Sequence, residues 1–529
     1  MRQVIAILAA ALPLAAQVIY EQIRNADQTP GNWLTFSGNY LGHRHSGLKL
    51  LNKSNAAAIK PVWVFQIDKT DKFEASPIVA DGIMYISEPP SDVTALETKT
   101  GRPLWRYRRV LPEDLRVCCG KVNRGVAVLG DKVFLTTLDA HLVALDALTG
   151  NTVWDVEVAP YKTGHSMTVA PLALKDKIVV GIAGGEFGIR GFLDAYDAQT
   201  GKRVWRFWTI PGAGEPGVQT WKGESYKYGS AATWVTGSYD PELNLIYWGT
   251  GNPGPDWNGE TRHGDNLYSD SVVALDADTG QLKWYFQFTP HDLHDWDATQ
   301  VPVLVDLPFQ GKPRKLMLFA NRNAFYYVLD RSSGQYLLSK QYVRQTWAQT
   351  SLDPKGRPIR LPNTEPTENG VLVYPNSPGA TNFYAPSYSP LTRLFYVNTR
   401  DEGGIFYSRR EEYKEGNWFL AGRFISKPGE EARGAVKALE PTTGIVKWEF
   451  PLHSPSWSGV LSTAGGLVFA GAHEGDFFAL DDTNGKLLWR FPTGGRIFAN
   501  PISYLSEGKQ QVAIAAGHAI FAFGLEGEK

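Results

Sequence analysis

The phrase ALDALTGNTVW at residues 144–154 decides the fold, because close copies of it recur along the whole chain. Each copy has an apolar strand end, a turn that contains Gly, and a Trp four residues after that Gly. The other copies lie at residues 95–105, 195–205, 274–284, 438–448 and 479–489, and a degraded copy at 328–338 has Leu338 at the Trp position. Self-similarity of this kind is the signature of a repeat architecture.

Each copy is predicted to form a β-hairpin whose Trp packs on the neighbouring repeat. The Gly supplies the positive φ of a tight turn, and the Trp buries a large flat surface. Strand-like runs at residues 126–136, 178–182, 245–249, 393–398 and 466–470 bring each unit to about four strands. With KPVWVF at residues 60–65 as half of one more repeat, the sequence predicts an all-β, eight-bladed β-propeller with tryptophan-docking motifs. We expect residues 17–529 to form one domain, since closed repeats exceed the usual domain size.

Two intervals between successive turn glycines are long, from Gly201 to Gly280 and from Gly334 to Gly444. In a propeller such extra length goes into loops on one face, so we expect these loops to cap a central site. The repeats alone leave a non-catalytic binding scaffold open as an alternative, because one fold can carry unrelated functions.

The charge balance argues against nucleic acid as a partner. Lys and Arg total 53 against 54 Asp and Glu, without a run of five or more like charges that would bind a polyanion. Residues 1–16 carry Arg2 and then an apolar run that ends in small residues, which predicts a signal peptide and export. About 13 apolar residues fall short of the roughly 20 that a membrane-spanning helix needs. We therefore expect no membrane span in the mature chain.

The two cysteines of the chain are neighbours, Cys118 and Cys119, in the segment RVCCGKVNRG. Adjacent Cα atoms lie about 3.8 Å apart, whereas ordinary disulfides prefer roughly 4.4 to 6.8 Å, so a bond between them would be strained. In an exported protein two thiols this close are expected to oxidise and to present a flat sulfur surface. The alternative is a pair of buried reduced cysteines that act as small apolar side chains.

The segment VCCGKVNRG resembles the cofactor-contacting segment of the methanol and ethanol dehydrogenase quinoproteins, which use pyrroloquinoline quinone (PQQ). The resemblance runs from GNWLTFSGNYLGHRHSGL at residues 31–48 to the last docking Trp. It implies that a disulfide between Cys118 and Cys119 covers one face of the quinone and that Trp234 covers the other. The further residues that it implies as cofactor contacts are Glu74, Arg124, Thr168, Ala183, Gly184, Gly185, Arg322 and Asn382. Trp457 is expected to contribute from another blade.

The resemblance also implies a metal site formed by Glu186, Asn252 and Asp295. Oxygen donors of this kind suit a hard cation such as calcium rather than zinc. Asp297, two residues after Asp295, adds a carboxylate that calcium-dependent relatives commonly replace with a small residue. More anionic ligands compensate a higher positive charge, so Asp297 favours a lanthanide over calcium, with a solvated surface aspartate as the alternative.

The expected chemistry is the oxidation of a primary alcohol to an aldehyde. The resemblance implies that the metal acts as a Lewis acid on the quinone, that Asp295 takes the alcohol proton, and that the carbon-bound hydrogen passes to the quinone as hydride. Arg322 is expected to hold Asp295 ionised and to stabilise negative charge on the quinone oxygens. Two further interpretations stay open: a propeller scaffold that has lost catalysis, and a sugar or polyol dehydrogenase that uses the same cofactor.

Two departures from the family pattern concern His294 and the end of the chain. His294 stands where relatives usually carry Trp, so we expect an altered substrate cavity or an altered orientation of Asp295. The segment AIAAGHAIFAFGL at residues 513–525 lacks the Gly-Trp tail of methanol dehydrogenases. No Cys-x-x-Cys-His haem motif is present, so we expect electrons to leave to a separate acceptor. The resemblance implies that this acceptor is a soluble cytochrome c in the periplasm. The oligomeric state stays open, a homodimer included.

Overall fold

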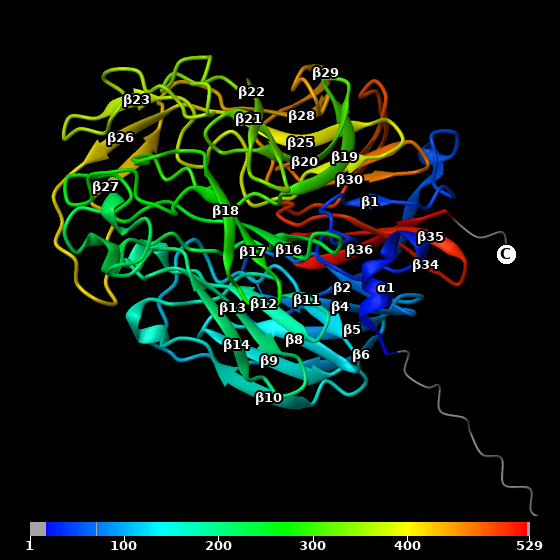
Figure 1. The fold of residues 1–529 in the computed structure, drawn as a ribbon. Helices are drawn as coiled ribbons and strands as arrows, with labels where there is room; N and C mark the ends of the chain where they lie inside the picture. The colour runs from blue at the N-terminus through cyan, green and yellow to red at the C-terminus, as the bar shows by residue number, and fades with distance from the viewer. Residues whose placement is uncertain (1–16, 70, 526–529) are drawn as a thin grey trace, which may run out of the picture.

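Each repeat phrase forms the outer hairpin of a four-stranded antiparallel sheet in the computed structural model of this protein, which describes residues 17–69 and 71–525. Eight sheets with this arrangement, one of them extended by a short fifth strand, are the blades of a propeller within these residues (Figure 1). Blades 1 to 4 consist of β3 (Ile78–Ala80), β4 (Ile83–Glu88), β5 (Asp92–Glu97) and β6 (Pro103–Tyr107); β7 (Ala127–Leu129), β8 (Lys132–Thr136), β9 (His141–Asp146) and β10 (Thr152–Glu157); β11 (Leu172–Leu174), β12 (Lys177–Gly181), β13 (Phe192–Asp197) and β14 (Arg203–Trp208); and β15 (Ser238–Asp240), β16 (Leu245–Gly249), β17 (Ser271–Asp276) and β18 (Leu282–Gln287). Blades 5 to 7 consist of β19 (Val303–Phe309), β20 (Lys312–Ala320), β21 (Phe325–Asp330) and β22 (Tyr336–Gln341); β24 (Ser387–Ser389), β25 (Leu394–Asp401), β28 (Arg433–Leu439) and β29 (Val446–Leu452); and β30 (Val460–Thr463), β31 (Leu467–Gly471), β32 (Asp476–Asp481) and β33 (Leu487–Pro492).

Blade 8 joins the two ends of the chain. Its inner strands are β34 (Ile502–Ser506), β35 (Lys509–Ala516) and β36 (Ala519–Gly524), and its outermost strand is β2 (Lys60–Gln66). β2 pairs with β36 in antiparallel orientation, and Figure 1 shows the blue and red ends of the ribbon meeting there. The predicted eight-bladed propeller, with residues 60–65 as half of a repeat, is therefore confirmed.

The remaining elements are short. β1 (His45–Ser46) pairs in parallel with β30, and a three-stranded sheet of β23 (Val371–Val373), β26 (Gly404–Ser408) and β27 (Gly422–Ser426) projects at one side in Figure 1. The helices are α1 (Tyr20–Arg24) and the 3-10 turns η1 (Ala26–Gln28), η2 (Ala56–Ala58), η3 (Tyr161–Thr163), η4 (Gly185–Phe187), η5 (Val218–Thr220) and η6 (Ser225–Tyr228). None of the helices among the described residues has the length and apolar character to cross a bilayer. The predicted signal peptide at residues 1–16 lies outside the described residues.

The docking tryptophans connect each blade to the next. The Trp105 indole donates a hydrogen bond to the Ala147 carbonyl in the turn of blade 2, with an N···O distance of 3.0 Å. In that turn Gly150 has φ +73°, and a Cβ there would lie 2.4 Å from the Trp105 ring. The turn Gly is thus required both by its backbone conformation and by the Trp that packs on it.

The degraded repeat in blade 5 contacts the next blade through side chains other than a Trp. Leu338 stands at the Trp position, and the Tyr326 hydroxyl instead donates to the Pro441 carbonyl at 2.9 Å. A Cβ at Gly444 would lie 2.7 Å from Lys340 Cβ. A Tyr from the third strand and the stem of a Lys from the fourth therefore replace the missing Trp.

Trp63→Ala is expected to lower the free energy of unfolding by about 3–5 kcal/mol, the range for large buried aromatics. Trp63 is buried in β2, and its indole donates to the Thr98 carbonyl at 2.8 Å, so it fastens blade 8 to blade 1. The shift of the chemical unfolding midpoint measures the effect, and Leu104→Ala, at a side chain 41% exposed on β6, is the control. Equal shifts for the two variants would contradict this role of Trp63.

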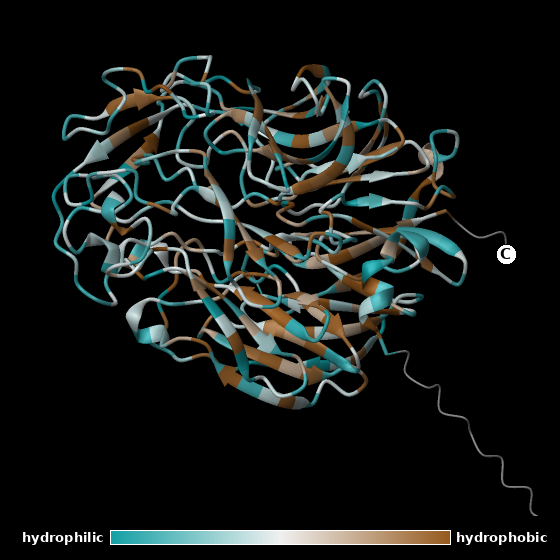
Figure 2. Cartoon of the chain, viewed as in Figure 1, coloured by the Kyte–Doolittle hydropathy of each residue, from teal (hydrophilic) through white to brown (hydrophobic). Residues whose placement is uncertain are grey.

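Apolar strands give the propeller a core that continues from blade to blade. Figure 2 shows apolar residues along the strands and polar residues mainly in the connections. The first strands of neighbouring blades contact one another, as β7 contacts β11 and β24 contacts β30. These first strands are consequently the innermost, and the segments that enter them lie around the propeller axis.

Candidate functional site

The site is a cavity of about 520 Å³ at one face of the propeller. One set of its residues comes from the segments that enter the innermost strands of the eight blades; in blade order these are Glu74, Arg124, Thr168, Trp234, Asp295, Asn382, Trp457 and Phe498. A second set follows the second strand of a blade, namely Ala183, Asn252, Arg322 and His473. Because the strands are antiparallel, the start of the first strand and the end of the second lie at the same edge of each sheet. The repeat thus directs all these segments to one place.

The structure brings every predicted site residue to this cavity. Besides those named above, its lining includes Cys118, Cys119, Gly184, Gly185, Glu186 and Asp297. The long intervals of the sequence contribute as expected: Trp234 and Asn252 come from the first interval, and Asn382 comes from the second.

Sequence reasoning missed several lining residues. These are Lys72, Val122, Ser166, Ala232, Ser377, Pro378, Phe383, Phe424, His473, Arg496 and Phe498. Phe498 lies four residues before β34, as Glu74 lies four residues before β3, and His473 lies two residues after β31, as Arg322 lies two residues after β20. Alignment of the repeats with one another was the signal that would have found these two.

The two cysteines form a disulfide on the cavity wall. Cys118 and Cys119 are bonded, which rules out the alternative of two reduced thiols in this structure. Cys119 has φ +70°, and the Lys72 ammonium donates to its carbonyl at 3.0 Å. Its Sγ lies 3.8 Å from Glu186 Oε1, so the disulfide adjoins one of the predicted metal ligands.

A buried ion pair lies at another part of the wall. Arg124 Nη2 and Glu74 Oε2 are 2.8 Å apart, and Arg124 Nη1 donates to Thr168 Oγ1 at 2.6 Å. The guanidinium lies 4.7 Å from the ring centroids of both Trp234 and Phe383. Burial raises the pKa of Glu74, and the charge of Arg124 opposes that rise. Arg124 Nε has no hydrogen-bond partner among the described residues, which leaves one buried donor for a ligand.

Arg322 joins the two aspartates of the predicted metal site. Its Nη1 lies 2.6 Å from Asp297 Oδ2, and its Nη2 lies 3.4 Å from Asp295 Oδ2. Asp297 also accepts hydrogen bonds from the Trp234 indole at 3.1 Å and from the Asn252 backbone N–H at 2.7 Å. Asp297 is 5% exposed, so the alternative of a solvated surface aspartate is wrong.

Asp295 occupies an uncommon backbone conformation, with φ +59°. Its Oδ2 accepts a hydrogen bond from Ser377 Oγ at 2.6 Å, in addition to its contact with Arg322. Non-glycine residues with positive φ persist where the surrounding structure holds them, and they concentrate at functional sites.

Within the described residues, the buried carboxylates of the predicted metal site outnumber the one guanidinium, that of Arg322, which pairs with two of them. Burial, together with the charge of Asp297, raises the pKa of Glu186 to about 7. Burial also raises the pKa of Asp295, with Asp297 adding to the rise and Arg322 opposing it. Buried carboxylates are stable as anions only when they are paired or bind a metal. Three carboxylates and an amide, all oxygen donors, fit a hard, multiply charged metal ion.

His294 does not line the cavity, so any effect of this residue on the cavity acts through its neighbours. Its side chain is fully buried, and its ring stacks on Trp296 with centroids 4.3 Å apart. His294 Nε2 lies 2.8 Å from the Thr364 carbonyl and therefore carries the proton of that hydrogen bond. The side chain next to Asp295 is thus tied to the second long interval of the chain.

Trp457 lines the cavity from blade 7. Its ring stacks on Phe383 with centroids 5.9 Å apart, and the Arg400 guanidinium lies 4.3 Å from its centroid. A Trp held between an aromatic ring and a guanidinium has little rotational freedom. The Trp457 ring is thus held in place at the cavity wall of a chain whose C-terminal segment lacks the Gly-Trp tail.

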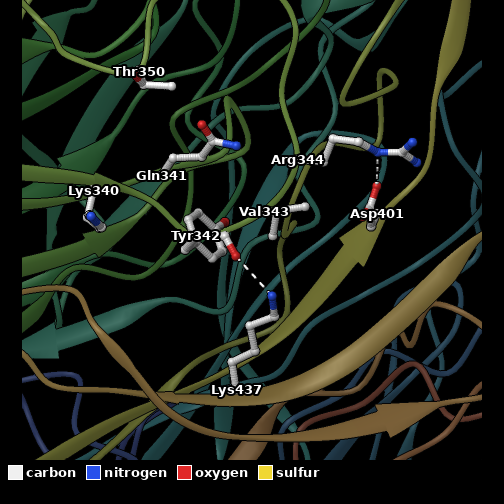
Figure 3. Close-up of a pocket in the computed structure, with 8 residues that line it drawn as sticks. All are labelled: Lys340, Gln341, Tyr342, Val343, Arg344, Thr350, Asp401 and Lys437. Atoms are coloured by element: carbon white, nitrogen blue, oxygen red, sulfur yellow. Dashed lines mark hydrogen bonds and ion pairs between the residues drawn. The ribbon is translucent and has the colours of Figure 1, made fainter.

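A second cavity, of about 410 Å³, has a different character. It lies beside β22, β25 and β28 and is lined by Arg344, Asp401 and Lys437 among others (Figure 3). Figure 3 shows Arg344 paired with Asp401 and Lys437 bonded to the Tyr342 carbonyl, so these charged groups already have partners. The cavity lined by the predicted cofactor and metal residues is consequently the candidate site.

Comparison with known proteins agrees with this geometry. The family model "PQQ: Glucose/ethanol/alcohol dehydrogenase, beta-propeller domain" matches residues 33–344 and 430–512. Quinoprotein alcohol dehydrogenase PedH of Pseudomonas putida is 39% identical, with 95% of this chain and 89% of that protein covered. The lanthanide-dependent methanol dehydrogenase of Methylacidiphilum fumariolicum is 36% identical, with 94% and 86% covered. The solved structure of a europium-containing methanol dehydrogenase is 33% identical and superposes with a TM-score of 0.91, covering 96% of this chain and all of that one.

Proposed function

Because the chain belongs to the PQQ-dependent alcohol dehydrogenases, we propose that it oxidises primary alcohols to aldehydes in this cavity, with a lanthanide as the metal. The observation that carries the proposal is the convergence of all the predicted cofactor and metal residues on one cavity. Folding of the propeller does not require this set together, which argues against a non-catalytic scaffold. A sugar or polyol dehydrogenase with the same cofactor is disfavoured by the disulfide of Cys118 and Cys119.

The cavity residues fit the quinone. Its volume of about 520 Å³ lies within the range of small-molecule sites. Trp234 and the disulfide offer flat surfaces, and Arg124, Thr168 and Asn382 offer hydrogen-bonding groups for carboxylates and carbonyls. We propose that Cys118, Cys119 and Trp234 sandwich the ring, and that Glu186, Asn252, Asp295 and Asp297 hold the metal.

The proposed mechanism assigns proton transfer to Asp295. When bound, the quinone supplies a two-electron acceptor for the hydrogen on the substrate carbon, and the metal supplies Lewis-acid polarisation. The Asp295 carboxylate takes the hydroxyl proton of the alcohol as general base. Arg322, in contact with both Asp295 and Asp297, favours the ionised form of Asp295, which is the form that can accept a proton. The walls formed by Phe383, Phe424 and Trp457 exclude water from the reacting carbon.

The proposed setting is the periplasm. The apolar run that follows Arg2 within residues 1–16 supports export, and family membership supports transfer of electrons to a soluble cytochrome c. We propose residues 17–529 as the mature, single-domain enzyme; a homodimer would be compatible with it.

Reconstitution tests the proposed function. Metal-free protein is supplied with PQQ and either lanthanum or calcium, and dye-linked oxidation of ethanol and methanol is followed. We expect turnover with lanthanum and far less with calcium. Turnover with calcium alone would overturn the choice of metal, and absence of quinone binding under both metals would favour the scaffold.

Arg124→Gln is expected to weaken quinone binding by at least about tenfold and also to destabilise the protein by about 3–5 kcal/mol, because Glu74 loses its buried partner. The double variant Arg124→Gln/Glu74→Gln separates the two effects. We expect it to recover stability, since no unpaired charge is left, but not quinone affinity, which fluorescence titration with PQQ measures. Full recovery of quinone affinity in the double variant would show that Arg124 acts only on the fold.

A further inference from the structure

Asp256 lies in the connection from β16 to β17, four residues after Asn252. It is 3% exposed, and the Asn252 side-chain N–H₂ donates to Asp256 Oδ1 at 3.0 Å. Asp256 is not among the residues that line the cavity. It therefore stands directly behind one of the proposed metal ligands.

The hydrogen bond fixes which end of the Asn252 amide faces the cavity. The nitrogen end is committed to Asp256, and the Asn252 backbone N–H is committed to Asp297 Oδ1 at 2.7 Å. Asn252 Oδ1 accepts no hydrogen bond from the described residues, while Asn252 itself lines the cavity. An amide oxygen held in this way is oriented as a ligand for a hard cation.

Asp256 also brings a fourth carboxyl group to the metal centre. Its neighbours include three carboxylates, Asp295, Glu186 and Asp297. Within the described part of the chain, no Lys, Arg or His nitrogen lies within 4.0 Å of the Asp256 carboxylate.

Arg262 lies nearby, but its positive charge is not in contact with the Asp256 carboxylate. It is fully buried, and its hydrogen bonds go to the Pro255 and Asp292 carbonyls and to Asn266 Oδ1. Four carboxylates thus converge on this region, and Arg322 forms ion pairs with Asp295 and Asp297 alone. The surplus of negative charge favours an ion of high charge.

We propose that Asp256 is a positioning residue of the metal centre, which orients Asn252 Oδ1 toward the ion and favours a trivalent over a divalent cation. The inference rests on the proposed metal-dependent function. The interaction of an added carboxylate with an ion is proportional to the charge of the ion. Removal of the Asp256 charge therefore lowers log affinity for a trivalent ion about one and a half times as much as for a divalent ion.

Terbium luminescence provides the test, because tryptophans near the cavity sensitise bound Tb³⁺ and added Ca²⁺ competes with it. Purified metal-free protein is titrated as wild type and as Asp256→Asn, which keeps an acceptor for Asn252 but removes the charge. We expect Tb³⁺ affinity to fall about 10- to 100-fold, as for other residues that support metal ligands, and Ca²⁺ affinity to fall less. Asp256→Glu, which retains the charge, is expected to recover most of the Tb³⁺ affinity.

The metal-free proteins give a second readout. Without a metal, Asp256→Asn replaces a buried carboxyl group among other carboxyl groups with an amide of the same size, so its thermal unfolding midpoint is not expected to fall below that of the wild type. Glu260→Gln is the matched control, because Glu260 lies in the same connection, is 57% exposed and pairs with Arg410 at the surface. There solvent screens the charge, and neither metal affinity nor stability should change appreciably.

The outcomes separate the inference from the proposed function. If the wild type binds Tb³⁺ but Asp256→Asn binds it equally well, or loses equal factors for Tb³⁺ and Ca²⁺, the role of Asp256 is overturned and the metal site stands. If the wild type binds neither ion, the metal-dependent function is overturned together with this inference.

Discussion

Asp295→Asn is expected to lower kcat for alcohol oxidation by about 10²- to 10⁴-fold, the usual contribution of a general base, while the propeller remains folded. The amide cannot take the hydroxyl proton, although it keeps the size of the carboxylate and can still accept the hydrogen bond from Ser377. The measurement is kcat at saturating PQQ and metal, with bound metal quantified so that loss of a ligand is not mistaken for loss of the base.

Ser377→Ala is the matched control for this prediction. It removes a hydrogen bond of 2.6 Å to the same carboxylate but leaves the base in place. A single hydrogen bond contributes about 0.5–1.5 kcal/mol, so the loss should not exceed about tenfold. If Asp295→Asn lost no more activity than Ser377→Ala, the base would have to be another residue.

Asp297→Ala is expected to change the metal preference of the enzyme, which is the second large effect that we predict. Asp297 is buried, paired with Arg322 at 2.6 Å, and hydrogen-bonded to Trp234 and Asn252. Its removal takes one carboxylate from the metal centre, and the loss of Coulomb energy is greater for a trivalent than for a divalent ion. We expect the activity with lanthanum to fall at least about 100-fold and the activity with calcium to fall much less.

The ratio of the two activities serves as the internal control for this variant. A general disturbance of the fold, or of the position of Arg322, would reduce the activity with both metals by a similar factor. A ratio equal to that of the wild type would show that Asp297 does not select the metal.

The repeats explain how much of the fold was predictable. A Gly with positive φ and a Trp that packs on such a Gly, as Trp105 packs on Gly150, form a recognisable sequence pattern in nearly every blade. The number of blades followed from these patterns and from the half repeat in β2. The Tyr326 contact of blade 5 was not predictable, because Tyr326 lies outside the repeated turn and its partner at Pro441 is 115 residues away.

The site was predictable where single residues have chemistry of their own. The cysteine pair, Glu186 and Asp295 stand out by residue type and by resemblance to a family. Phe498 and His473 have no distinctive residue type, and only their positions relative to the repeated strands mark them as cavity residues. Likewise the burial of His294 behind Asp295, and its bond to Thr364 some 70 residues away, depends on a long loop without a recognisable motif.

The most direct test of the central claim is a single turnover without an electron acceptor. Protein loaded with PQQ and lanthanum is mixed anaerobically with excess ethanol, and the quinone absorbance and acetaldehyde are quantified. We expect the oxidised quinone spectrum to be lost with one acetaldehyde formed per bound quinone, and to persist in Asp295→Asn. An unchanged quinone spectrum in the loaded wild-type protein, with no acetaldehyde formed from any primary alcohol supplied, would contradict the account.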